Sequence, residues 1–207
     1  MSLLTTWGYT LTDVDELPDL LTAEEFNELT ANKYATDGRV AANISAASSA
    51  VRNYCSWHVY PELACELDIA LFDRRVSMTD REILVQLPAR FVSEVTSVEI
   101  AGEAHTDFVL ETNGILRIYN VRKFVHKYTR LAVEYTAGIP DAFISAVKEL
   151  IAHRVTHALA SSAGVQSETA GGVSITYNAN WVNSSRATAL ADDNKEVLAP
   201  YRIQGVF

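Results

Sequence analysis

The sequence predicts an α+β protein, in which a small helical bundle carries a β-rich insertion between its second helix and its long third helix and ends in an extended C-terminal segment. Apolar residues recur at helical spacing before residue 66 and after residue 138, and alternate at strand spacing in between. Helix-start signals open both helical regions. We therefore expect residues 1–65 and 138–207 to form a helical core with N- and C-terminal arms, and residues 66–137 to form an inserted β-rich subdomain.

The composition is that of a globular protein without a membrane span. Of 207 residues, 48% are hydrophobic and 21% are charged, and no apolar run approaches ~18 residues. The N-terminus lacks the basic region of a secretory signal. The only cysteines, Cys55 and Cys65, have no further ligands at zinc spacing, which favours a reducing compartment. We expect no cofactor.

The net charge of −9, from 26 acidic and 17 basic side chains, argues against a protein that reads DNA sequence. Phosphate groups dominate affinity for nucleic acid, and an acidic protein repels them. Such a surface suits a protein that lets DNA slide past without holding it.

Two helices are predicted before the β-rich region. Thr22 and Glu25 have the spacing of a capping box, which predicts a helix over residues 23–31. Asp37 can cap a second helix that runs to about residue 54. The apolar stripe of this second helix consists of Val40, Ile44, Ala47, Val51 and Tyr54.

The opposite side of the second helix is small rather than charged. Two interpretations remain open, because the helix could be buried on two sides within its own domain or could contact another subunit. The residues on this side are Ala42, Ala46, Ser49, Ala50 and Asn53.

The β-rich region contains alternating runs separated by turn signals. Asn113–Gly114 predicts a hairpin because both positions of the favoured turn need a positive φ, and Ala101–Gly102 marks another turn. The predicted strands are 83–87, 95–100, 108–111, 115–119 and 131–135.

Pro140 opens a long third helix, because proline at the first turn lacks only a donor that the helix leaves unpaired. Residues 165–172 predict a mobile loop, and residues 173–177 a short strand. A short helix then precedes an extended end at residues 200–203. The apolar stripe of the long helix is Phe143, Val147, Leu150, Ile151, Val155 and Ala158.

No residue pattern predicts a catalytic or metal site. Glu149, His153 and His157 have a spacing that could bind a metal, but they point away from the apolar stripe, which favours solvated or interface histidines. Cys55 with His58 could form a nucleophile and base, although Trp57 and Tyr60 beside them favour a buried aromatic helix end.

One basic cluster lies near the end of the β-rich region. Such a run could bind phosphates, yet a solvated loop or a contact for an acidic protein surface is the favoured interpretation. Its members are Arg117, Arg122, Lys123, Lys127 and Arg130.

Four stretches in this order resemble the head-tail connector (head completion, or adaptor) proteins of siphophage-type tailed bacteriophages. They are residues 44–57 (ISAASSAVRNYCSW), 87–98 (LPARFVSEVTSV), 133–140 (VEYTAGIP) and 198–202 (LAPYR). The resemblance implies a helical bundle with a β-rich insertion and no catalysis. It also implies a virion protein at the capsid vertex, assembled in the host cytoplasm.

The partners that this resemblance implies are other copies of the chain, the portal protein, head-closure or tail proteins, and genomic DNA passing without specific binding. A dodecamer-like ring under the portal would extend the DNA channel. We expect the ring contact at Ala42, Ala46, Ala50 and Asn53. The residues expected to dock on the portal are Val197, Leu198, Pro200, Tyr201, Arg202 and Ile203.

Three alternatives remain. Another phage morphogenesis protein, for head closure or tail completion, would be favoured by a β-barrel-dominated core. A small hydrolase or metal-dependent enzyme would use His153, His157 and a carboxylate. A nucleic-acid-binding module would use the basic cluster.

Overall fold

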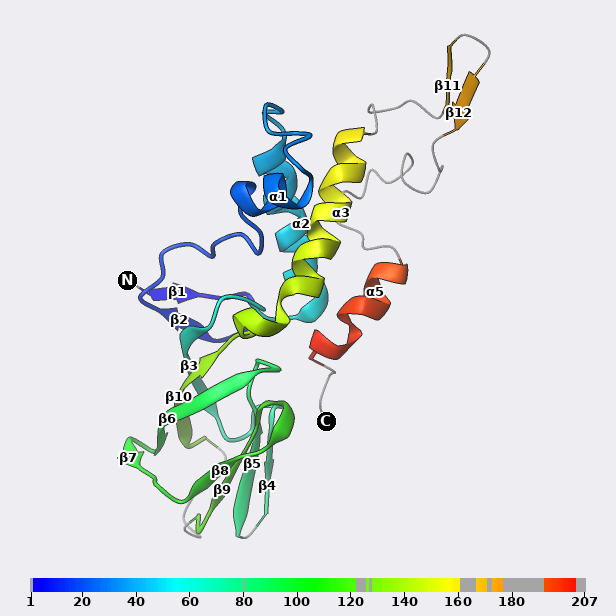
Figure 1. Cartoon of the computed structure of the whole chain (residues 1–207). Coiled ribbons are helices and arrows are strands. Elements are labelled where there is room, and N and C mark those ends of the chain that lie inside the picture. Colours follow the sequence, from blue (N-terminus) through cyan, green and yellow to red (C-terminus); the bar gives the residue numbers. More distant parts are fainter. Residues whose placement is uncertain are drawn as a thin grey trace. The chain divides into compact units, whose positions relative to one another are not determined.

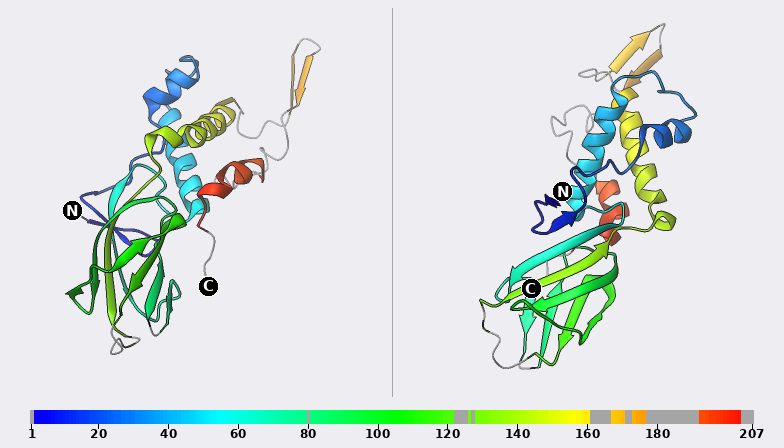
Figure 2. Two further views of the ribbon diagram at one scale, coloured as in Figure 1. Left: turned by 60° about the horizontal axis from the view of Figure 1, so that its bottom comes forward. Right: turned by 90° about the vertical axis from the view of Figure 1, so that its left-hand side faces the viewer.

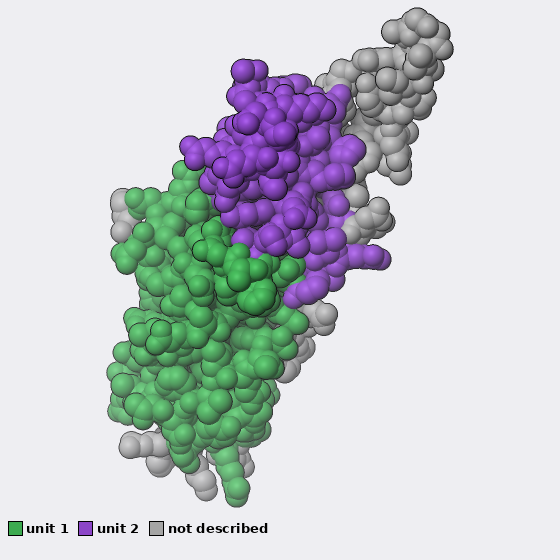
Figure 3. Space-filling view, in the orientation of Figure 1, with its two compact units in different colours: residues 1–18, 55–143, 201–207 green, residues 19–54, 144–200 purple. Residues whose placement is uncertain are grey.

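A computed structural model of the chain divides into two compact units (Figure 3). Unit 1 contains residues 1–18, 55–143 and 201–207, and unit 2 contains residues 19–54 and 144–200. No helix among the described residues is long and apolar enough to cross a membrane. The structure describes residues 2–79, 81–121, 126, 128–160, 167–170, 173–176 and 192–203.

Unit 1 contains two antiparallel sheets (Figure 1). The six-stranded sheet has the order β1 (Ser2–Leu4), β2 (Thr10–Thr12), β3 (Leu63–Ala70), β10 (Arg130–Ala137), β6 (Val92–Ile100) and β7 (Glu103–Ala104). The four-stranded sheet has the order β4 (Val76–Met78), β5 (Glu82–Gln86), β9 (Ile115–Tyr119) and β8 (Phe108–Leu110). The long strands β3, β10 and β6 run side by side (Figure 2).

The core of unit 1 follows the predicted alternation. Successive side chains of a strand point to opposite faces, so every second residue can be buried. Strand β10 buries Leu131, Val133, Tyr135 and Ala137, and exposes Glu134 between them. The other inward residues are Cys65, Leu67 and Ile69 of β3, Ile83 and Val85 of β5, and Leu116 and Ile118 of β9.

Both predicted turns are confirmed. The turn between β8 and β9 contains η1 (Thr112–Gly114), where Asn113 has φ 65° and Gly114 has φ 72°. Ala101 and Gly102, with φ 57° and 77°, join β6 to β7. Asparagine and glycine adopt this left-handed backbone conformation at little cost, which is why the pattern was informative.

A hairpin of β1 and β2 joins the six-stranded sheet through β3, and the sequence did not predict it. Between these strands, the buried Tyr9 hydroxyl lies 2.7 Å from His58 Nδ1 and accepts a hydrogen bond from the His58 backbone N–H at 3.0 Å. His58 Nε2 lies 2.8 Å from the Ala137 carbonyl oxygen. Because that carbonyl can only accept, Nε2 carries the proton and Nδ1 accepts from Tyr9.

Tyr9→Phe is therefore expected to lower the free energy of unfolding by about 2 kcal/mol, because it removes the buried hydroxyl that pairs with both His58 Nδ1 and the His58 backbone N–H. Urea unfolding followed by circular dichroism measures this change. Tyr128→Phe is the control, since the Tyr128 side chain is 63% exposed and the expected change is within ~0.5 kcal/mol. Equal stability of the two variants would show that the Tyr9–His58 pair contributes little.

Unit 2 contains α1 (Ala23–Leu29), most of α2 (Val40–Cys55), α3 (Ser145–Ala160) and α5 (Asp192–Leu198). The capping box at the start of α1 is confirmed, with Thr22 N to Glu25 Oε2 at 2.8 Å and Glu25 N to Thr22 Oγ1 at 3.2 Å. The buried stripe of α3 consists of Val147, Leu150, Ile151, Ala152, Val155 and Leu159.

A short hairpin of β11 (Ser167–Ala170) and β12 (Val173–Thr176) also belongs to unit 2. The predicted strand at residues 173–177 is confirmed over its described part. Residues 167–170, which we expected in a mobile loop, form a strand instead, and the rest of that predicted loop, at 165–166 and 171–172, lies outside the described residues.

The predicted fold class is wrong. The described residues form mainly two antiparallel sheets of six and four strands with short helices, rather than a helical bundle with a β-rich insertion. Strands β1 and β2, at three residues each, are too short to show alternation in the sequence. They form because β3 supplies hydrogen-bond partners to β2, and β2 in turn pairs with β1.

Two smaller expectations for the helices also fail. Phe143 and Ala158, placed in the apolar stripe of the long helix, are exposed, because the helix begins at Ser145 and turns Leu159 inward instead. Pro200 and Tyr201 lie in the 3-10 helix η3 (Ala199–Tyr201) rather than in an extended end.

Candidate functional site

Helix α2 has an exposed face without a charged side chain. Val40, Ile44 and Val51 are buried on the other side of the helix, and Arg52 is only 6% exposed. Protein surfaces normally mix charges of both signs, at roughly a quarter to a third of their residues. The exposed residues are Ala41, Ala42, Ser45, Ala46, Ser49 and Asn53, and we call this set the α2 face.

Three of the four residues predicted for a subunit contact lie on the α2 face. Ala42, Ala46 and Asn53 are exposed, whereas Ala50 is only 2% exposed and packs inside its own subunit. Ala41 and Ser45 were not predicted, although Ser45 follows Ala42 by three residues and Ala41 by four, which is the spacing of one helix face. Within one subunit, α2 is therefore buried on one side only.

The C-terminal residues predicted to dock on a portal divide into exposed and anchored ones. In unit 2, Val197 is 44% exposed and Pro200 is exposed, whereas Leu198 is buried. In unit 1, the Tyr201 carbonyl accepts a 2.7 Å hydrogen bond from Trp57 Nε1.

The chain beyond Tyr201 stays attached to unit 1. The Ile203 N–H donates to the Cys55 carbonyl at 3.1 Å. Arg202, which lies between Tyr201 and Ile203 in the chain, is exposed. Of the six residues predicted to dock, Val197, Pro200 and Arg202 are therefore the exposed ones.

The described arginines of the basic cluster are paired with carboxylates. Arg117 Nε lies 2.6 Å from Glu111 Oε1, and Arg117 Nη1 lies 2.8 Å from Glu82 Oε2. Hydrogen bonds to these two carboxylates raise the pKa of Arg117. Arg130 lies 2.6 Å from Asp68. These pairs offset the positive charge that phosphate binding needs. Arg122, Lys123 and Lys127 lie outside the described residues.

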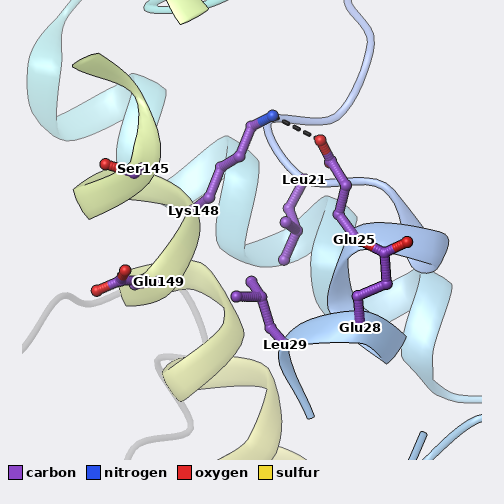
Figure 4. A pocket seen from close by; sticks show the side chains of 7 residues that line it. All are labelled: Leu21, Glu25, Glu28, Leu29, Ser145, Lys148 and Glu149. Carbon is purple, nitrogen blue, oxygen red and sulfur yellow. Dashed lines mark hydrogen bonds and ion pairs between the residues drawn. The ribbon is translucent and has the colours of Figure 1, made fainter. Parts of the chain in front are cut away.

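A hollow of about 350 Å³ lies between α1 and α3 in unit 2 (Figure 4). Lys148 Nζ lies 2.6 Å from Glu25 Oε1 at its edge. Burial opposes ionisation of Glu25, but hydrogen bonds from Lys148 and Thr22 outweigh it and lower the Glu25 pKa. The pair links α1 to α3. The other lining residues are Leu21, Glu28, Leu29, Ser145 and Glu149.

A comparison with protein-family models gives a match over residues 19–202 to a family described as head completion protein. The chain belongs to this family. It is accordingly a structural protein of phage head completion, and its place is the virion. A search of curated proteins finds no match. The match confirms the resemblance seen in the sequence, and it begins after the β1–β2 hairpin.

Cys55 and His58, for which the sequence favoured a buried helix end over a nucleophile and base, are both buried in this head completion protein. Burial raises the pKa of the Cys55 thiol to about 12 and that of Cys65 likewise to about 12, so neither is a thiolate at neutral pH. The ring nitrogens of His58 face Tyr9 and the Ala137 carbonyl. These groups form part of the core of unit 1.

The two histidines of α3 do lie together in the head completion protein. His153 and His157 are exposed, with their Nε2 atoms 3.1 Å apart and their ring centres 4.4 Å apart. Partial burial, and next the neighbouring His153, lower the pKa of His157. No group of three or more histidine, cysteine or acidic side chains among the described residues could hold a metal.

Proposed function

We propose that this head completion protein is a head-tail connector (adaptor) subunit that forms a ring under the portal. The ring would extend the DNA channel and provide the platform on which head-closure or tail proteins assemble, without catalysis. The α2 face is the observation that carries the proposal beyond family membership, because it is an exposed helix surface with no charge.

A ring requires a contact in which two different surfaces of neighbouring subunits meet and the rotation closes. Helices approach closely where their side chains are small, and the buried centres of interfaces are depleted in charged residues. The α2 face supplies both properties through Ala42, Ala46 and Ser49. We propose it as one of the two surfaces of the ring contact.

The charge balance supports passage of DNA rather than its retention. The net charge is −9, and the described arginines Arg117 and Arg130 are held by carboxylates. A channel with these properties would repel phosphates. A nucleic-acid-binding module would instead show salt-sensitive affinity for DNA, which an Arg122/Lys123/Lys127 triple alanine variant would remove.

Docking on the portal is assigned to the C-terminal region. Val197, Pro200 and Arg202 are exposed there. Leu198 is buried, and the Tyr201 carbonyl accepts the hydrogen bond from Trp57. The exposed residues would contact the portal, and the anchored ones would hold the segment in place.

Native mass spectrometry of the purified chain, alone and with the portal protein of the same phage, tests this proposal. We expect the portal to bind many copies at a stoichiometry that matches its own symmetry, as a dodecamer-like ring. A chain that stays monomeric and does not bind the portal would contradict the connector role.

A head-closure or tail-completion role is the second candidate, and the two sheets of unit 1 favour it. Head-closure and connector proteins occupy successive levels of the same assembly, so they differ in what they bind first. A chain that ignores the isolated portal but binds a portal already carrying a connector ring would support this second role.

A further inference from the structure

Two histidines on one exposed helix surface are not used by the connector proposal. His153 and His157 are one turn apart on α3, and their Nε2 atoms lie 3.1 Å apart. Because both residues belong to the same helix, the fold holds their backbones at a constant separation.

This separation fits two ligands of one metal ion. Bonds from zinc to histidine nitrogen are about 2.0–2.1 Å long. Two such bonds to nitrogens 3.1 Å apart enclose an angle of roughly 100°. That value lies between the right angle of square-planar or octahedral sites and the tetrahedral angle.

The same distance also suits a hydrogen bond between two neutral rings, in which one Nε2–H donates to the other Nε2. When a metal ion binds, the donating ring shifts its proton from Nε2 to Nδ1, so that both Nε2 lone pairs can bind the ion while both rings stay neutral. Hard cations such as Mg²⁺ and Ca²⁺ prefer oxygen ligands, whereas imidazole suits Zn²⁺, Ni²⁺ and Cu²⁺.

We propose that His153 and His157 chelate one divalent transition-metal ion of this class through their two Nε2 atoms. Water completes the coordination, because the described residues supply no third histidine, cysteine or acidic ligand in a group with these two. The site is thus an open surface chelate and not a buried structural zinc site. It is independent of the ring contact, which lies on α2.

Isothermal titration calorimetry of the untagged full chain with ZnCl₂ or NiCl₂ tests the proposal. We expect one ion per chain, and at least tenfold weaker binding in both His153→Asn and His157→Asn. The control is His126→Asn, which changes an exposed histidine of unit 1 and should leave binding unchanged. Far-UV circular dichroism should show the same helix content in all variants.

A second measurement separates binding to the native helix from non-specific binding. An ion that binds only the folded chain raises the thermal midpoint, so ZnCl₂ should raise it for the wild type and not for either helix variant. The proposal is wrong if the wild type binds no ion, if both variants bind as tightly as the wild type, or if only one histidine matters.

Discussion

Ala46→Arg is expected to abolish portal-templated ring formation while leaving the subunit folded. Ala46 is exposed at the centre of the α2 face. Arginine has nearly the helix propensity of alanine, so α2 should keep its structure. In a ring contact, however, the long charged side chain would prevent close approach and would be buried without a partner, which costs several kcal/mol. Native mass spectrometry with the portal measures the loss.

Two variants control this experiment. Ala46→Ser keeps the small size and should still assemble, which separates size and charge from the mere loss of alanine. Ala158→Arg makes the same substitution at an exposed alanine of α3 and should also assemble. If Ala46→Arg forms rings as the wild type does, the α2 face is not the ring contact. If the wild type itself does not assemble, the connector role fails instead.

Gly114→Ala is expected to lower the free energy of unfolding by about 3 kcal/mol, as the sum of backbone strain and overpacking. Gly114 is buried, has φ 72°, and accepts a 2.8 Å hydrogen bond from Leu87 N–H. An added methyl group would overlap the Ala89 carbonyl oxygen, which is backbone and cannot rotate away. Urea unfolding of Gly114→Ala and the wild type measures the effect.

Gly102→Ala is the matched control, because Gly102 has φ 77° but no atom within 4 Å of the added methyl group. Gly102→Ala introduces the backbone strain without a clash, and we expect it to lower the free energy of unfolding by about 1 kcal/mol. The difference between the two variants isolates the clash with Ala89. Equal losses would mean that the β8–β9 turn can move away from Ala89.

Local signals in the sequence predicted local structure well. Thr22 with Glu25, and Asn113 with Gly114, act through atoms a few residues apart, so their hydrogen bonds and φ values hardly depend on the rest of the fold. Alternation in β5, β9 and β10 was visible because five to eight residues span several periods. The stretches that resembled connector proteins were confirmed by the family match over residues 19–202.

Of the candidate site, the sequence supplied the small residues of α2 but not their exposure. Ala46 and Ala50 are one turn apart and chemically identical, yet one is exposed and the other buried. Only packing within unit 2 distinguishes them. The same holds for Arg117, whose pairing with Glu82 joins residues 35 positions apart in the chain.

The sequence by itself determined the family, the capped start of α1, the tight turns and the alternation of β5, β9 and β10, because these depend on neighbouring residues and their order. The tertiary structure decided that sheets rather than helices dominate, that Tyr9 fastens an N-terminal hairpin to His58, and which alanines of α2 are exposed. Those features depend on hydrogen bonds and burial between segments tens of residues apart, which no local periodicity encodes.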